Sequence, residues 1–284
     1  MTLHQLHFVP PVPLLVAQEL GLLAEAGIDI EARRTRSSDE QLKRLASGDV
    51  DLVVTAMDNV FLWNQLGADV RIVAQTEQTT LLTVYGRPGL RALSDVEGGR
   101  FGVDALANGF AIVARALLAE AGVTADFVQI GGVTERLDAL VAGTIDATLL
   151  GPPLDELAER AGMTRLASAN EAFPSFPGQG VVVRADRSVP KTCELGAYLD
   201  VLQRAVTASE SMTDANGIEL LARHGFPRRS AADAWQTRPR SLAIDPTGVA
   251  LVESLRARFA ALPHGYAGRE SLVDQDLAGR SGNP

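Results

Sequence analysis

The sequence predicts an α/β protein of two similar βαβαβ lobes, joined by two crossing strands and followed by a helical tail. Its 284 residues exceed a typical single domain, which favours two. The phrase LAEAG at 23–27 recurs unchanged at 118–122, and GDVD at 48–51 returns as GTID at 143–146. Both pairs are 95 residues apart, and the match runs without a gap from 3–76 to 98–171. Each lobe therefore carries one copy of the same unit.

Strands and helices alternate along the first copy. Prolines at 10, 11 and 13 end the first strand, Ser38 can cap the second helix, and glycines at 48 and 67 end the second and third helices. Apolar periodicity places strands at 6–9, 28–32, 52–55 and 70–74 and helices at 14–20, 38–48 and 60–66. This alternation favours parallel strands with right-handed crossovers.

The second copy repeats this order. We expect strands at 100–103, 127–130, 147–150 and 165–167 and helices at 111–121, 135–141 and 154–160. Strand-like runs at 81–85 and 180–184 predict the two crossings between the lobes. Residues 1–86 and 181–284 would then form lobe 1, and residues 87–180 would form lobe 2.

The C-terminal part of the chain is helical in pattern. Periodic runs at 195–212, 217–224, 231–237 and 247–262 predict a helical tail that packs on lobe 1. Residues 265–284 are polar and lack periodicity, so we expect them to be loosely held.

The composition excludes several kinds of partner and site. A net charge of −9 without a run of Lys or Arg argues against nucleic acid and membrane surfaces. No apolar stretch reaches the about 18 residues that insertion into a bilayer needs. Cys193 is the only cysteine, and no histidine has a His or Cys neighbour at metal-ligand spacing. Nucleotide-binding glycine motifs are also absent, so we expect neither a metal nor a cofactor.

The N-terminal residues bear on localisation. They lack the charged, apolar and small-residue segments of a secretory leader. The chain as it stands is therefore expected in the cytoplasm, and outside it if the native protein has a leader that this sequence lacks.

The repeat also predicts a ligand site, because open α/β sheets bind ligands beyond the carboxyl ends of their strands and clefts between lobes hold small molecules. The strand-end loops are 9–13, 35–38, 56–59 and 75–77 in lobe 1, and 104–110, 131–134, 151–154 and 169–173 in lobe 2. The expected binding residues are Pro11, Val12, Arg36, Ser37, Ser38, Ala56, Met57, Asp58 and Gln75, together with Asn108, Gly109, Phe110, Gly131, Gly132, Gly151 and Pro152.

Some of these residues suggest specific chemistry, each with a structural alternative. Arg36 beside two serines can hold a carboxylate or sulfonate, or it can be a solvated arginine before a helix cap. Gly131 and Gly132 allow close backbone approach to a ligand, or they form an ordinary turn. Asn108 can cap a helix while it presents its amide to a ligand.

Catalytic patterns are weak. No G-x-S-x-G nucleophile motif is present. Asp58 could act as a base, although it could also only cap the following helix. His7, on the first strand, is the other candidate, and its alternative is a buried, hydrogen-bonded core histidine.

Three phrases resemble a known family. Residues 11–30, the phrase LASGDVDL at 45–52 and its echo LVAGTIDA at 140–147 are similar to type II periplasmic solute-binding proteins of the NMT1/THI5-like branch, which handles sulfonates, nitrate and thiamine-pyrimidine precursors. The resemblance covers residues 5–185. It implies a Venus-flytrap protein whose lobes close on a small molecule, with an ABC permease as partner if it is exported. The chain lacks the cysteine-rich motif of the pyrimidine-synthase relatives, which argues against that activity.

The expected function is therefore hinge-closing binding of a small organic molecule, acidic or aromatic. The alternative is a cytoplasmic enzyme on the same fold: a metal-free lyase, that is a dehydratase, decarboxylase or desulfinase of a small cyclic or aromatic acid. A sensor or receptor domain is a third reading.

Overall fold

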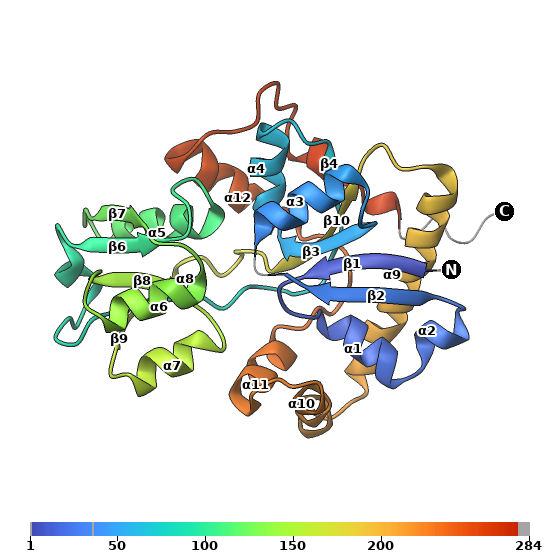
Figure 1. Ribbon diagram of the computed structural model, residues 1–284, viewed down its shortest axis with the longest axis horizontal. Coiled ribbons are helices and arrows are strands. Elements are labelled where there is room, and N and C mark those ends of the chain that lie inside the picture. Colours follow the sequence, from blue (N-terminus) through green and yellow to red (C-terminus); the bar gives the residue numbers. More distant parts are fainter. Residues whose placement is uncertain (1, 36, 278–284) are drawn as a thin grey trace. The chain divides into compact units, whose positions relative to one another are not determined.

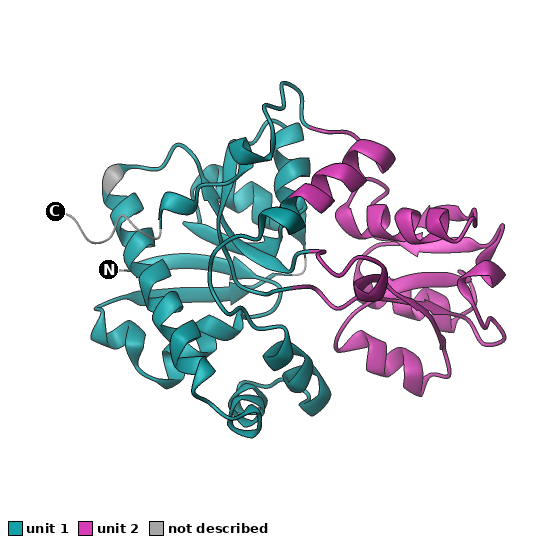
Figure 2. Ribbon diagram, turned by 180° about the vertical axis from the view of Figure 1, so that it is seen from behind, with its two compact units in different colours: residues 1–78, 177–249, 263–284 teal, residues 79–176, 250–262 magenta. Residues whose placement is uncertain are grey.

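The chain folds into two units, each built around one sheet (Figure 2). The computed structural model describes residues 2–35 and 37–277. Unit 1 comprises residues 1–78, 177–249 and 263–284, and unit 2 comprises residues 79–176 and 250–262. The sequence placed the breaks near 86 and 180 and gave the whole helical tail to lobe 1. In the structure, residues 79–86 and 250–262 belong to unit 2, so the chain passes between the units four times.

Unit 1 holds the first copy of the repeat and most of the helical tail. Its strands are β1 (Thr2–His7), β2 (Asp29–Arg34), β3 (Leu52–Ala56), β4 (Val70–Gln75) and β10 (Gln179–Arg184). Its helices are α1 (Val12–Glu19), α2 (Leu22–Glu25), α3 (Ser38–Ser47), α4 (Asn59–Gln65), α9 (Val189–Glu210), α10 (Asp214–Arg223), α11 (Arg228–Gln236) and the short 3₁₀ helix η2 (Arg269–Leu272).

Unit 2 holds the second copy. Its strands are β5 (Thr83–Gly86), β6 (Arg100–Val103), β7 (Asp126–Gln129), β8 (Ala147–Leu150) and β9 (Thr164–Ser168). Its helices are η1 (Leu93–Val96), α5 (Gly109–Glu120), α6 (Val133–Val141), α7 (Leu154–Arg160) and α8 (Ala169–Ala172), and most of α12 (Pro246–Phe259) joins them.

The two sheets have equivalent strand orders, β2-β1-β3-β10-β4 in unit 1 and β7-β6-β8-β5-β9 in unit 2 (Figure 1). The strands of the repeat are parallel to β1 or to β6 where they pair with it. Strands β10 and β5 run antiparallel to both of their neighbours. The predicted α/β fold class is confirmed, but the sheets are mixed rather than all parallel, because each crossing strand is inserted into a sheet.

Apolar helix faces cover the sheets. In unit 1, helices α1, α9, α10 and α11 share a core with one face of sheet 1, including Leu3, Tyr198 and Trp235. In unit 2, helices α6 and α7 pack on sheet 2 through a second core that includes Leu140 and Ala158. None of the helices within the described ranges combines the length and apolar character that a membrane span requires.

Two local predictions were wrong. The first strand begins at Thr2 rather than at residue 6, because Thr2–His7 pairs along the whole of β2. Residues 265–277, expected to be loosely held, are tied to unit 1. Val273 bridges Ile72 at the edge of β4, and Asp274 N–H donates to the Ile72 carbonyl at 2.9 Å. Leu272 and Leu277 are buried there, since the edge of β4 offers both unpaired backbone groups and apolar surface.

Candidate functional site

The carboxyl ends of β1, β3 and β4 lie at one edge of sheet 1, beside the start of β10. The β1–α1 loop reaches this edge, where Pro11 is the N-cap of α1 and makes no side-chain cap bond. Pro11 and Val12 line a small cavity there. Ala56 ends β3, and Met57, only 1% exposed, is directed into the protein rather than towards solvent.

The serine loop before α3 lies at the same edge. Ser37, rather than the expected Ser38, is the N-cap, and its hydroxyl accepts from Glu40 N–H at 3.3 Å. Ser38 is the first residue of α3. Arg36, the expected acid-binding residue, lies outside the described residues.

Two expected ligand residues of unit 1 are buried. Asp58, 4% exposed, occupies the N-cap position of α4 but makes no side-chain cap bond to it. Gln75 joins β4 to the segment before α12: its Oε1 accepts from Asp245 N–H, and its Nε2 donates to the carbonyls of Glu77 and Gln78, all at 3.0 Å. The Gln75 amide is therefore engaged in packing within unit 1.

His7 ends a buried polar chain. Tyr198 Oη donates to Gln5 Oε1 at 2.8 Å, and Gln5 Nε2 lies 3.2 Å from His7 Nδ1. Because the Gln5 oxygen is taken by the tyrosine, its NH₂ group faces Nδ1, which makes Nδ1 the acceptor and leaves the proton on Nε2. Burial, with a smaller contribution from Arg34, lowers the pKa of His7 to about 4. His7 is thus a neutral histidine at neutral pH.

Arg238, which the sequence analysis missed, lies at this edge as well. It follows α11, is 5% exposed, and stacks on the Trp235 ring with 3.9 Å between its Cζ and the ring centroid. It lines a cavity of about 40 Å³ together with Val9, Pro10, Pro11, Val12, Val54, Thr76, Glu77, Gln179, Phe226, Ala234 and Thr237. An arginine before a proline at a helix end carries no sequence signal that it will fold onto the edge of a sheet whose strands lie far away in the chain.

In unit 2, a buried arginine holds the loop after β6. Arg136 of α6 has a side chain only 3% exposed, and its Nη1 lies 3.3 Å from Asp104 Oδ1. Burial lowers the pKa of Arg136, and Asp104 and Glu135 oppose that shift. Asn108, the N-cap of α5, accepts from Ala111 N–H at 2.9 Å and also donates to Asp104. The predicted cap role of Asn108 is thus present, and its amide is partly engaged within the loop.

The expected glycines of unit 2 lie where the backbone conformation or a close contact favours a residue without a side chain. Gly131 has φ +124°, a conformation that favours glycine, and Gly132 is the N-cap of α6 without a side-chain cap. A Cβ on Gly151 would lie 2.5 Å from the Leu81 carbonyl oxygen, so the crossing segment requires glycine there. The remaining expected residues of this edge are Gly109 and Phe110, which open α5, and Pro152, which follows Gly151.

Exposed apolar side chains gather on the strand-end loops. Seven large hydrophobic residues are exposed within the described chain. Three of them lie in these loops: Val9 after β1, Leu106 after β6 and Val133 at the start of α6, with 39%, 45% and 41% exposed. Apolar surface at a site that also carries polar groups is typical of small-molecule binding.

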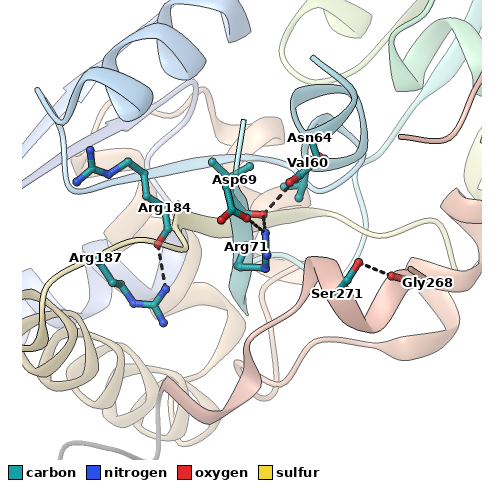
Figure 3. Close-up of polar contacts among 9 residues, drawn as sticks. Val60, Asn64, Asp69, Arg71, Arg184, Arg187, Gly268 and Ser271 are labelled. Atoms are coloured by element: carbon teal, nitrogen blue, oxygen red, sulfur yellow. Dashed lines mark hydrogen bonds and ion pairs between the residues drawn. The ribbon is translucent and has the colours of Figure 1, made fainter. Parts of the chain in front are cut away.

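A larger cavity, of about 410 Å³, lies at the opposite end of sheet 1. Its two arginines already have acidic partners: Arg71 lies 2.5 Å from Asp69, and Arg187 pairs with Asp274. Arg187 also donates to the Arg184 carbonyl at 2.9 Å (Figure 3). The Arg187–Asp274 pair joins the segment after β10 to the C-terminal segment, and the Arg71–Asp69 pair is local to the start of β4, so the cluster has a structural role. Among residues 2–35 and 37–277, no group of three or more His, Cys, Asp or Glu could hold a metal ion.

Comparison with known proteins agrees with this architecture. A family model described as NMT1/THI5 like matches residues 11–208. No curated protein sequence matches the chain. The ligand-binding component of an ABC-type import system from Staphylococcus aureus, with zinc bound, superposes with a TM-score of 0.82 at 14% identity, covering 99% of both chains.

Two further solved structures share the fold. The alkanesulfonate-binding protein SsuA from Xanthomonas axonopodis pv. citri, bound to MOPS, has a TM-score of 0.72 at 18% identity, covering 99% of this chain and 97% of that chain. The periplasmic nitrate-binding protein NrtA from Synechocystis PCC 6803 has a TM-score of 0.77 at 13% identity, covering 99% and 88%. At these identities the likeness establishes the fold alone.

Proposed function

Because the chain belongs to the NMT1/THI5-like family, we propose that it binds a small organic molecule with an apolar or aromatic body and an acidic group. The strand-end loops of both units supply the contacts, and the units close on the ligand. If the protein is exported, an ABC permease receives the solute. The solved structures with this fold that bind sulfonate or nitrate support an anionic ligand class.

One observation carries the proposal: the same loops present exposed apolar side chains beside helix starts that lack side-chain caps. Val9 precedes α1, which has no side-chain cap, and Val133 is the first residue of α6, whose N-cap is Gly132. The start of α1 offers at most the Val12 N–H, because Pro13 has none and Leu14 N–H donates to the Pro11 carbonyl at 3.0 Å. The positive end of a helix dipole favours a negative group, and the apolar side chains favour a hydrocarbon body. Both features lie at the carboxyl ends of strands, where we expect the ligand, and they support an amphipathic solute.

A thermal-shift screen tests the proposal. The purified protein is heated with aromatic acids, sulfonates, amino acids and pyrimidines, and each stabilising compound is analysed by mass after incubation. A ligand at 100 times its Kd adds about 2.7 kcal/mol of stability. Recovery of the compound intact supports solute binding. Recovery of a product whose mass is lower by that of water, carbon dioxide or sulfite would contradict simple binding and would indicate lyase activity. A screen in which no compound stabilises the protein would also contradict the proposal.

Two valines on one helix provide a matched pair of variants. Val133→Ser removes an exposed apolar side chain at the ligand end of α6, whereas Val141→Ser removes one, 51% exposed, at the other end. We expect Val133→Ser to weaken binding of the identified solute by about threefold to tenfold, because apolar contact area is lost. Val141→Ser should keep the wild-type Kd in isothermal titration. Equal effects of the two changes would contradict a contact at Val133.

A further inference from the structure

Arg238 is a buried cation without an acidic partner among the described residues. It lies more than nine-tenths buried in unit 1, and none of its nitrogens is in an ion pair within the described ranges. Its Nη1 donates to the Trp235 carbonyl at 2.5 Å, and its Nε has no hydrogen-bond partner there. Arg136, another buried arginine, pairs with Asp104 instead.

A buried guanidinium without an ion pair lowers the stability of a protein that has no ligand bound. Burial of a charge is unfavourable unless an opposite charge or hydrogen bonds compensate. Burial, ahead of the repulsion from Arg240, lowers the pKa of Arg238, while Asp214 and Glu210 act on it only as more distant charges. A guanidinium nevertheless stays protonated at neutral pH. The structure thus retains, at the edge of sheet 1 where we expect the ligand, a buried positive charge that forms no ion pair with the described residues.

A second unsatisfied atom lies against the same cavity. Gln179 begins β10 and lines the cavity with Arg238, and its buried Oε1 has no hydrogen-bond partner in the described part of the chain. Arg238 Nε requires an acceptor, and Gln179 Oε1 requires a donor. The volume of about 40 Å³ accommodates a head group of a few heavy atoms, with the rest of a solute outside. Val9 and Val12, on the wall of the cavity, are apolar.

We propose that Arg238 binds the anionic head group of the solute, a carboxylate or sulfonate, and that Gln179 accepts a hydrogen bond from an O–H or N–H group beside it. This assignment rests on the proposed function and deepens it. It places the head group on a residue contributed from the helical tail, and the role expected for Arg36, which lies outside the described residues, stays a prediction. A trapped water molecule could bridge the same two atoms, but its binding would not depend on an added anion.

Head-group analogues test the assignment without knowledge of the solute. Methanesulfonate and acetate are titrated in a thermal-shift assay at constant ionic strength, with sodium chloride as the balancing salt. Dimethyl sulfone and acetamide serve as uncharged counterparts of similar shape. We expect both anions to raise Tm and both uncharged compounds to leave it unchanged. Anions that stabilise no more than chloride or the uncharged compounds would overturn the proposal.

Variants locate the effect. Arg238→Gln and Arg238→Met remove the charge, and the Met side chain preserves apolar packing on Trp235. In whichever of them folds, the apparent affinity for both anions should fall by about tenfold or more, because a charge-assisted hydrogen bond is lost. Arg240→Gln, which removes an exposed arginine two residues away that acts on Arg238 only as a nearby charge, should weaken anion binding much less than the loss of Arg238 does. Wild-type affinity in a folded Arg238 variant would overturn the proposal.

The outcomes separate this inference from the proposed function. A solute from the screen that binds Arg238→Gln as tightly as wild type removes the role of Arg238 and leaves solute binding intact. Anion binding that depends on Arg238, in a protein that no solute stabilises, supports the head-group site and contradicts the proposed function.

Discussion

Single residues at equivalent positions of the repeat have diverged in chemistry while keeping their place. Gln41 and Arg136 are 95 residues apart, and both are buried on the first turns of α3 and α6. Gln41 donates to the Val54 carbonyl at 2.9 Å, whereas Arg136 pairs with Asp104. Because α3 and α6 are equivalent helices of the repeat, the identity of this one side chain decides whether the contact beneath the helix is neutral or charged.

His7 offers a pH prediction at this scale. Its pKa of about 4 in the folded protein lies below the value of 6.5 expected when unfolded. The unfolded chain therefore takes up a proton as pH falls through 6.5, while the folded protein does so only near pH 4. Between pH 6.5 and pH 5, this group should lower the free energy of unfolding by about 2 kcal/mol.

Urea denaturation at several pH values measures that loss. In His7→Gln the side-chain carbonyl can still accept from Gln5, and the contribution of this group to the pH dependence should vanish. The control is His4→Gln, which removes an exposed histidine from the same strand and should keep the wild-type slope. If His7→Gln lost stability with pH as steeply as wild type, the buried neutral histidine would be the wrong explanation.

At the scale of elements, the repeat preserves helix ends most closely. Helices α4 and α7 have bounds separated by the same 95 residues, Asn59–Gln65 and Leu154–Arg160. Helices α3 and α6 are followed by Gly48 and Gly143, with φ of +80° and +70°. A left-handed residue at a helix end satisfies otherwise unpaired carbonyls, and glycine adopts it without steric cost. The end signals therefore could be predicted locally.

Helix α10 owes its position to one close contact instead. A Cβ on Gly217 would lie 2.1 Å from Cε2 of Trp235, so α10 packs directly on the indole of α11. At an open helix position, Gly→Ala would stabilise by about 1 kcal/mol. Here we expect Gly217→Ala to destabilise by about 1–3 kcal/mol, because the methyl group overpacks the indole.

Chemical denaturation shows whether Gly217→Ala raises or lowers the free energy of unfolding. Asn216→Ala, one residue earlier on the exposed side of α10, is the matched control and should change stability by no more than about 0.5 kcal/mol. Because Arg238 stacks on Trp235, Gly217→Ala should also weaken methanesulfonate binding. An increase in the stability of Gly217→Ala would show that the contact between α10 and the Trp235 indole leaves room for a methyl group.

At the scale of the whole molecule, the two sheets differ in continuity. The strands of sheet 2 all lie within residues 79–176, whereas sheet 1 takes β10 from the chain that follows them. Strand β10 separates β3 from β4 in sheet 1, and β5 separates β8 from β9 in sheet 2. Sheet 1 is therefore completed only by a strand that follows the repeat of unit 2 along the chain. The chain passes between the units outside the strands at 78/79 and 176/177, again within α12 at 249/250, and finally at 262/263, so several segments rather than a single linker join the units.

The proposed closure has a direct test in solution scattering. With saturating solute, the radius of gyration of the wild-type protein should decrease, because a ligand that contacts both units favours the closed arrangement. Arg238→Gln at the same solute concentration should keep the ligand-free profile. Superimposable wild-type profiles with and without bound solute would count against closure.

The sequence by itself determined the two copies, most of their strands and helices, and the edge of each sheet to which the loops predicted to bind a ligand lead. These features follow from apolar periodicity, helix caps and glycines, which act over a few residues, and from an internal repeat that is evident in the sequence. Only the tertiary structure decided that Arg238 is buried on Trp235, that the Gln75 amide is engaged with Asp245, and that Val273 adds to the edge of β4. Such contacts join residues far apart in the chain, so their energies depend on packing that no local pattern encodes.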